Sequence, residues 1–327
     1  MSRIGVIGAG AWGTAIAHTM AANDHKVLLW TRDEVVAEQI NNQHQNPKYL
    51  GAIELNPNVR ATFNPANAII DADFLFLVTP AQTTANSARM LLNHGVKQGT
   101  AIVCCAKGLD QNSGKRVSET VSETLPSNPV LVLSGPSFAH DVASGLPTAV
   151  TLACDDLQTA LAACKTLSSN TLRLYASDDL RGVELGGALK NVMAIAAGIV
   201  KGVGLGESAK AALIARGFVE MERLAEAYGA RPQTLKGLSG LGDLVLTCGT
   251  EQSRNYSYGL SLASSAGCQS KKLAEGAYTA NSAKRLAEQL NVDAPIITAV
   301  AKVLAGDQTI AEAVESLTSR PVKAELD

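Results

Sequence analysis

Gly8-Ala-Gly10-Ala-Trp12-Gly13 directly follows a short apolar run, Arg3-Ile-Gly-Val-Ile7, and leads into Thr14-Ala-Ile-Ala-His-Thr-Met20, which has the pattern of a helix. A second apolar run comes next, Lys26-Val-Leu-Leu-Trp30. A GxGxxG spacing alone is a weak signal in a chain with 28 glycines. Strand, glycine turn, helix and strand in this order, however, form the context in which that spacing binds a dinucleotide. We therefore predict a dinucleotide-binding unit at the start of the chain.

Each glycine of this turn has an expected task. Gly8 permits the tight turn, Gly10 lets the backbone approach a diphosphate, and Gly13 lets the helix pack close to the strand. The N-terminus of the helix would then present free N–H groups and a positive dipole end to the phosphates. The alternative is a glycine-rich turn that holds no ligand.

Composition narrows the classes of protein to consider. The 327 residues are enough for two domains with their own cores. A net charge of −2 and only 4% aromatic residues argue against a nucleic-acid partner. There is no uninterrupted apolar run of transmembrane length, so we expect no stable membrane insertion. Six cysteines occur without a CxxC or zinc-type spacing, which indicates reduced thiols in a cytoplasmic protein and no metal site.

The first half of the chain alternates strand and helix patterns. The expected strands are short and apolar, as buried parallel strands are: Arg3–Ile7, Lys26–Trp30, Val59–Phe63, Phe74–Val78, Thr100–Cys104, Val130–Leu133, Ala149–Leu152 and Leu172–Tyr175. This pattern predicts a doubly wound α/β domain of Rossmann type over residues 1–177. Strand patterns then stop, and Asp178-Asp179 can start a helix. We predict an all-helical second domain over residues 178–327.

Cofactor choice depends on the end of the second strand. A carboxylate there usually bonds the ribose 2′-OH of NAD, whereas an arginine can meet the 2′-phosphate of NADP. The strand ends Trp30-Thr31-Arg32-Asp33, so both residue types are present. Arg32 can equally be a solvated surface charge. We expect both cofactors to work, with NADPH at least as good as NADH.

Polar segments follow several later strands, and the carboxyl ends of parallel strands meet at one edge of a sheet. They are Val78-Thr79-Pro80, Cys105-Ala-Lys107-Gly-Leu109 and Ser134-Gly135-Pro-Ser137-Phe-Ala139. Lys107 would stand at the edge of the crevice. The backbone near Gly135 and the hydroxyl of Ser137 suit a phosphate or another polar substrate. Each segment alone can be ordinary loop sequence, but together they describe a site.

The helical half offers one lysine in unusual surroundings. Lys190 lies in Glu184-Leu-Gly-Gly-Ala-Leu-Lys-Asn191, an otherwise small and apolar segment. Desolvation there would lower its pKa and suit it to proton transfer near neutral pH. The alternative is a lysine whose head reaches water along its stem. Asp243, in a glycine-rich turn, either caps a helix or pairs with Lys190.

A second polar group follows at Ser253-Arg254-Asn255. An arginine fork beside a hydroxyl and an amide can hold a phosphate dianion from several sides. Three polar residues in a loop carry little weight without the rest of the site.

These segments together resemble the NAD(P)-dependent glycerol-3-phosphate dehydrogenase family in its bacterial form. The resemblance covers essentially the whole chain and rests on six ordered motifs: Gly8-Ala-Gly-Ala-Trp-Gly-Thr14, Ala106-Lys-Gly-Leu109, Ser134-Gly-Pro-Ser-Phe-Ala139, Gly186-Gly-Ala-Leu-Lys-Asn-Val192, Gly240-Leu-Gly-Asp-Leu244 and Gln252-Ser-Arg-Asn255. It implies a 6-phosphogluconate-dehydrogenase-like architecture with the substrate between the two domains. The implied reaction is reduction of dihydroxyacetone phosphate to sn-glycerol 3-phosphate, the backbone precursor of glycerophospholipids.

The resemblance also implies residue roles. Lys190 corresponds to the proton donor and acceptor, with Asp243 and Lys107 beside it. The implied substrate contacts are Lys107, Gly135, Ser137, Lys190, Asp243, Ser253, Arg254 and Asn255. The implied cofactor contacts are Gly8, Gly10, Ala11, Trp12, Gly13, Arg32, Lys107, Ala139, Arg254, Leu273 and Glu275. The family usually carries valines before the last of these, whereas this chain reads Lys272-Leu-Ala-Glu-Gly276, which weakens the assignment of Leu273.

Two other functions fit parts of the sequence. One is another dehydrogenase of the same architecture, such as a β-hydroxyacid dehydrogenase or a ketopantoate reductase, against which the phosphate-holding Ser253-Arg254-Asn255 argues. The other is a non-catalytic NAD(P) sensor, against which Lys190 and Asp243 argue. The sequence leaves a homodimer open.

Overall fold

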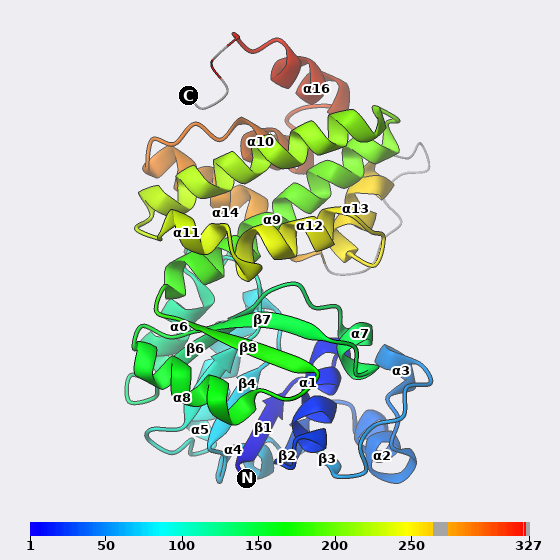
Figure 1. The fold of residues 1–327 in the computed structure, drawn as a ribbon, viewed down its shortest axis with the longest axis vertical. Helices are drawn as coiled ribbons and strands as arrows, with labels where there is room; N and C mark the ends of the chain where they lie inside the picture. The colour runs from blue at the N-terminus through cyan, green and yellow to red at the C-terminus, as the bar shows by residue number, and fades with distance from the viewer. Residues whose placement is uncertain (264–273, 323, 325–327) are drawn as a thin grey trace.

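The computed structural model describes residues 1–263, 274–322 and 324. Figure 1 shows two parts, a sheet flanked by helices that includes the N-terminus and a group of helices that includes the C-terminus. The chain passes from one part to the other between β8, which ends at Ser177, and α9, which begins at Leu180.

Eight strands form a single sheet in the order β3-β2-β1-β4-β5-β6-β7-β8. Their bounds are β1 Arg3–Ile7, β2 Lys26–Trp30, β3 Val59–Thr62, β4 Phe74–Leu77, β5 Ala101–Cys104, β6 Val130–Ser134, β7 Thr148–Ala153 and β8 Leu172–Ser177. The first six are mutually parallel, and β1 pairs with β2 on one side and β4 on the other. This confirms the predicted doubly wound sheet and the places of its strands.

The direction of the last two strands was predicted wrongly. β7 is antiparallel to β6, and β8 is parallel to β7, so both run against the other six strands. The connection between β6 and β7 contains only the five-residue helix α7, Ala139–Ala143. β7 starts near the edge where β6 ends and returns from there.

Helices cover both faces of the sheet. One buried cluster joins it to α1 (Ala11–Ala22), α2 (Glu34–Gln43), α3 (Pro47–Leu50), α7 and α8 (Leu157–Leu167). A second cluster, on the other face, joins it to α4 (Pro65–Ile69), η1 (Ala81–Thr83), α5 (Thr84–Asn93), α6 (Val117–Thr124) and the start of α9. With both faces covered, the central strands are almost wholly buried, which explains their apolar sequences.

The described residues after Ser177 contain helices and turns only, as predicted. Their bounds are α9 Leu180–Gly202, α10 Gly206–Ala227, α11 Pro232–Leu235, η2 Leu238–Gly242, α12 Asp243–Cys248, α13 Arg254–Leu262, α14 Glu275–Gln289, α15 Pro295–Ala305 and α16 Ile310–Thr318. The expected helix start is confirmed, since Asp179 caps α9 by accepting a hydrogen bond from the Gly182 N–H at 2.9 Å.

α9 is the central helix of this part, in contact with α10, α12, α13, α14 and α15. It is long and apolar enough to span a membrane, but its most apolar window is entirely buried inside the protein. The helix is therefore the core of the helical domain, and its burial explains why its sequence is small and apolar all round.

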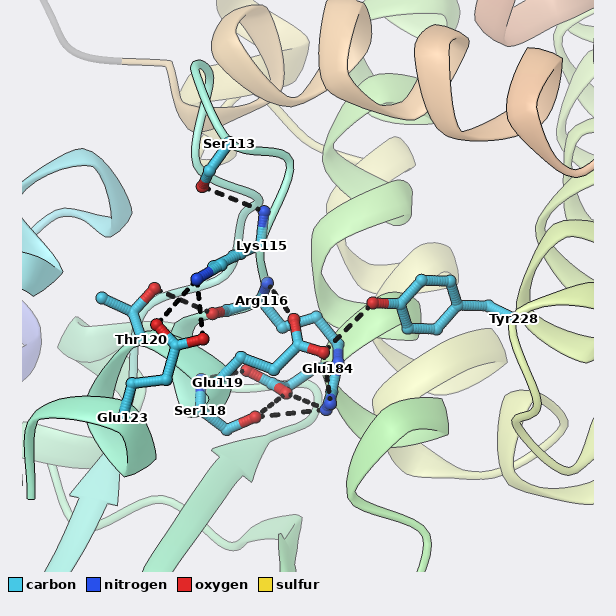
Figure 2. Close-up of polar contacts among 9 residues, drawn as sticks. All are labelled: Ser113, Lys115, Arg116, Ser118, Glu119, Thr120, Glu123, Glu184 and Tyr228. Carbon is cyan, nitrogen blue, oxygen red and sulfur yellow. Dashed lines mark hydrogen bonds and ion pairs between the residues drawn. The ribbon is translucent and has the colours of Figure 1, made fainter. Parts of the chain in front are cut away.

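A buried polar cluster joins the two parts (Figure 2). The Arg116 guanidinium, at the start of α6, donates to a Glu184 oxygen on α9 at 2.7 Å and to Glu119 at 3.1 Å. Ser118 donates to the same Glu184 carboxylate through its backbone N–H, at 2.9 Å, and through its hydroxyl. Tyr228, at the end of α10, donates to Glu119 at 3.2 Å and lies against the Arg116 guanidinium. This cluster fixes α9 against the sheet domain.

Candidate functional site

The glycine turn after β1 has the geometry that the sequence predicted. Gly8 adopts φ +117°, which side chains rarely allow. A Cβ on Gly13 would lie 1.9 Å from the Gly8 carbonyl oxygen, so only glycine permits this approach of helix and turn. A Cβ on Gly10, in contrast, would meet nothing within 4 Å. The turn is therefore packed tightly on one side and open at Gly10.

The open side suits the diphosphate of a dinucleotide. α1 begins at Ala11 with Gly10 as its N-cap, and no side chain caps its first N–H groups. It also has no acidic residue in its first turn, so the positive end of its dipole is not neutralised locally. Ala11 and Trp12, at this end, are partly exposed. Unpaired N–H groups at a helix start are a ready anion site, so the residues fit the group.

Arg32 and Asp33 follow β2 at the same edge of the sheet. Arg32 is exposed and has no hydrogen bond or ion pair to any residue that the structure describes. Asp33 caps α2 by position and pairs with Lys48 at 2.8 Å. The carboxylate that could serve a ribose hydroxyl already has a partner, whereas the guanidinium remains available for a phosphate.

Two lysines share one buried carboxylate where the sheet domain meets the helical domain. Lys190 Nζ on α9 donates to Asp243 Oδ1 at 3.0 Å, and Lys107 Nζ after β5 donates to Asp243 Oδ2 at 2.6 Å. Lys107 also donates to the Gly135 carbonyl after β6, at 3.0 Å. Lys190 is 6% and Asp243 1% exposed. The alternative in which the Lys190 amine reaches water is therefore wrong. Asp243 pairs with Lys190 and does not cap a helix.

Burial and charge set the protonation of this cluster. Burial lowers the pKa of Lys190 to about 8; Asp243 opposes that shift and Lys107 adds to it. Burial alone would raise the pKa of Asp243, but the charges of Lys107 and Lys190 outweigh it and hold that pKa below its ordinary value. With both lysines protonated, two positive charges face one negative charge. The cluster therefore favours an anionic ligand or a developing negative charge.

The local fold explains how Asp243 comes to this place. A π-helical turn, η2, directly precedes Asp243 and packs against α9. The helix α12 begins at Asp243, immediately after this turn. π-helical turns are rare and occur often at functional sites. One turn further along α12, Thr247 Oγ1 accepts from Lys190 at 2.6 Å and donates to Asp243 at 3.1 Å. Sequence reasoning missed Thr247, although its i+4 spacing from Asp243 places both on one helix face.

Amide side chains connect the lysine cluster to α13 and α14. Asn191 donates to the Lys107 carbonyl at 3.1 Å and accepts from Asn255 at 2.9 Å. Asn255 in turn accepts from the Gly276 N–H at 2.9 Å. Asn191 was also missed by sequence reasoning; its position beside Lys190 was the only signal. This chain of bonds connects the start of α14 to α9 and to the segment after β5.

The remaining predicted site residues occupy distinct places. Ser253 caps α13 by accepting from Tyr256 N–H, and Arg254, the first residue of that helix, is exposed. Ser137 is partly buried and donates to the Gly135 carbonyl at 3.0 Å, and Ala139 begins α7. The prediction at Leu273 lies outside the described residues.

Glu275 reaches back from α14 to the nucleotide domain. Its Oε1 accepts from the Ala81 N–H after β4 at 3.2 Å, while its buried Oε2 has no partner among the described residues. Burial raises the pKa of Glu275, opposed by Ala81 and by the charge of Arg254. An unpaired buried oxygen is a position where a bound ligand can supply the missing donor.

Three features are typical of a two-domain dinucleotide-dependent dehydrogenase: a nucleotide-type sheet, a glycine turn without a side-chain cap, and a Lys–Asp–Lys cluster that joins the sheet domain to the helical domain. Comparison with known proteins gives the particular family. Models of the NAD-dependent glycerol-3-phosphate dehydrogenase N-terminus and C-terminus match residues 3–160 and 179–315. The chain belongs to this family and is an NAD(P)-dependent oxidoreductase, which confirms the resemblance seen in its motifs.

Individual relatives are similar over the full length. The chain is 50% identical to glycerol-3-phosphate dehydrogenase [NAD(P)+] of Brucella canis over 324 residues, 99% of each chain. It is also 50% identical to the enzyme of that name from Mesorhizobium japonicum, covering 99% of this chain and 94% of that one. The crystal structure of glycerol-3-phosphate dehydrogenase from Coxiella burnetii superposes with a TM-score of 0.91 at 34% identity, covering 98% and 99%.

Proposed function

We propose that this chain reduces dihydroxyacetone phosphate to sn-glycerol 3-phosphate at the Lys190–Asp243–Lys107 cluster, reversibly and with NADPH or NADH. The observation that carries this proposal is the sharing of one buried carboxylate by two lysines at the carboxyl edge of the sheet. The reduced nicotinamide supplies the hydride when it is bound. The residues of the chain supply the charge, the proton and the alignment.

Lys190 is the proton donor in this scheme. An ammonium group donates three hydrogen bonds, and Lys190 uses two of them, to Asp243 and Thr247. The third is available to the carbonyl oxygen of the substrate. That oxygen gains negative charge as the carbon is reduced, so the ammonium stabilises it and then protonates it. In the reverse direction the neutral amine removes the same proton.

Asp243 and Thr247 are positioning residues for that proton transfer. Asp243 accepts from both lysines and so holds the two amines on one carboxylate. Thr247 bonds both Lys190 and Asp243 and restricts the rotation of the amine. Lys107 adds a second positive charge close to the developing oxyanion.

The substrate phosphate is assigned to the start of α13. Arg254 extends from the first position of this helix, where the N–H groups also favour an anion. Ser253 and Asn255 flank it, and Asn255 is fixed by its bonds to Asn191 and Gly276. Binding at the phosphate contributes alignment at the distant carbonyl.

The proposal extends to the choice of cofactor and to the location of the protein. Arg32, exposed and available after β2, supports NADPH as at least as good a cofactor as NADH. We also propose the domain division at residues 1–177 and 178–327 and a cytoplasmic location. Turnover of dihydroxyacetone phosphate with each reduced cofactor, followed by identification of the product, tests the proposed reaction directly.

Replacing Arg254 by alanine should raise KM for dihydroxyacetone phosphate by about ten- to a hundredfold, because one charge-assisted contact contributes about 1.5–3 kcal/mol. Residual reduction of unphosphorylated dihydroxyacetone should hardly change. Arg60→Ala is the control, since Arg60 is exposed on the edge strand β3. Equal losses on both substrates would show that Arg254 does not contact the phosphate.

The value of kcat/KM should change with pH in opposite ways for reduction and for oxidation. Lys190, whose burial-lowered pKa is about 8, must be protonated for reduction and neutral for oxidation. The value of kcat/KM for reduction should therefore fall as pH rises through about 8, while that for oxidation rises. Initial rates at low substrate concentration between pH 6 and 10 measure both. Profiles of the same sign in both directions would contradict the role of Lys190.

A further inference from the structure

A buried asparagine from a distant loop holds the glycine turn. Asn46 lies between α2 and α3, and its side chain reaches the turn after β1. Its Nδ2 donates to the Ala9 carbonyl at 3.0 Å and to Thr14 Oγ1 at 2.8 Å. The residue is 0% exposed. No feature of the glycine motif itself pointed to this residue.

This contact is not explained by the helix that Asn46 begins. Asn46 is the N-cap of α3, but its side chain makes no capping bond there, and Pro47 follows it. Its Oδ1 is buried and has no hydrogen-bond partner among the described residues. Leaving such an oxygen unpaired costs about 1–3 kcal/mol. The side chain thus serves the turn at a cost to local stability.

The orientation of the amide is fixed by its partners. The Ala9 carbonyl only accepts hydrogen bonds, so the NH₂ group of Asn46 must face it. Thr14 Oγ1 accepts from the same NH₂ group and lies 3.4 Å from the Ala9 carbonyl oxygen, to which it donates. Two side chains, Asn46 and Thr14, therefore hold the Ala9 carbonyl pointing into the protein.

The direction of that carbonyl decides the direction of the next N–H. The peptide bond between Ala9 and Gly10 is trans, since the described chain has no cis peptide bond. In a trans peptide the C=O and N–H groups point to opposite sides. The Gly10 N–H therefore points away from Asn46 and Thr14, the side chains that donate to the Ala9 carbonyl.

We propose that Asn46 is a positioning residue that holds the Ala9–Gly10 peptide so that the Gly10 N–H can donate to the dinucleotide diphosphate. The inference rests on the proposed function, because it places the cofactor at this turn. Asn46 does not touch the cofactor itself. It removes the freedom of one peptide plane that would otherwise have to be ordered on binding.

The test is the affinity for NADH, measured by fluorescence titration of the purified chain without substrate. Asn46→Asp keeps the shape of the side chain but removes the donor and sets a carboxylate oxygen against the Ala9 carbonyl. We expect Kd for NADH to rise about tenfold. At saturating NADH, kcat and KM for dihydroxyacetone phosphate should stay near their wild-type values, which a general loss of folded protein would not allow.

Asn41→Asp is the matched control. Asn41, on α2, also makes two bonds to backbone, donating to the Ala61 carbonyl at 3.0 Å and accepting from the Ala61 N–H at 2.8 Å, but it does not contact the turn. Its replacement should leave Kd unchanged. Thr14→Val provides a second variant if Asn46→Asp fails to fold, with an expected several-fold rise in Kd, because it removes one of the two groups that Asn46 bonds.

The outcomes separate this inference from the proposed function. A wild-type chain that does not bind NADH would overturn both. A wild-type chain that binds NADH, with Kd equal in the Asn46→Asp and Asn41→Asp variants, would overturn the role of Asn46 alone. If only Thr14→Val folds, an unchanged Kd in that variant has the same meaning.

Discussion

Replacing Lys190 by methionine should lower kcat for reduction of dihydroxyacetone phosphate by at least about 10²–10³-fold, the usual effect of removing one group that stabilises a developing oxyanion. The loss of proton transfer adds to that effect. Methionine has nearly the length of lysine and fills the same buried space, so a cavity does not explain the result. Asp243 keeps Lys107 as a partner at 2.6 Å and is not left as an unpaired charge. Steady-state kinetics at saturating cofactor measure the loss.

Two controls isolate the chemical role. NADH affinity should be nearly unchanged in Lys190→Met, because the glycine turn lies in the other domain. Lys210→Met removes a lysine from the neighbouring helix α10, where it pairs with Glu207, and should keep most of the turnover. Near-wild-type kcat in Lys190→Met would show that another group transfers the proton.

Replacing Glu184 by alanine should lower the free energy of unfolding by about 3–5 kcal/mol, which is the usual cost of removing one partner of a buried ion pair. The side chains of Arg116 and Glu184 are 8% and 6% exposed. The variant also removes the acceptor of the buried Ser118 N–H and hydroxyl. Glu119 remains beside Arg116 and limits the loss. Denaturant and thermal unfolding both measure it.

A surface ion pair of the same length is the control for this variant. Lys97 and Asp71 are 2.7 Å apart, but their side chains are 61% and 57% exposed. Asp71 also pairs with Arg3 at 3.3 Å, and that pair is equally exposed. Asp71→Ala should change stability by about 1 kcal/mol or less, because water and salt screen both pairs. A similar small effect in Glu184→Ala would show that the cluster between α6 and α9 contributes little to holding the domains together.

The fold was largely determined by local sequence. The central strands of the sheet are short apolar runs, and Gly8 and Gly13 are required by a positive φ and by a close backbone approach. Such requirements act over a few residues, so they can be recognised in sequence. The direction of β7 could not, since strands of both directions bury the same apolar residues. It is defined only by the pairing of the folded strands, in which β7 lies antiparallel to β6.

The site shows the same division. The sequence by itself determined which chemical groups are present and indicated a desolvated Lys190, because an apolar helix surrounds it. Only the tertiary structure decided that Lys107, 83 positions earlier in the numbering of the chain, shares Asp243 with it, and that Thr247 and Asn191 complete the cluster. No sequence motif points to the role of Asn46, for the same reason. Its task is defined by a carbonyl 37 residues away, and hydrogen bonds between distant segments exist only once packing has brought those segments together.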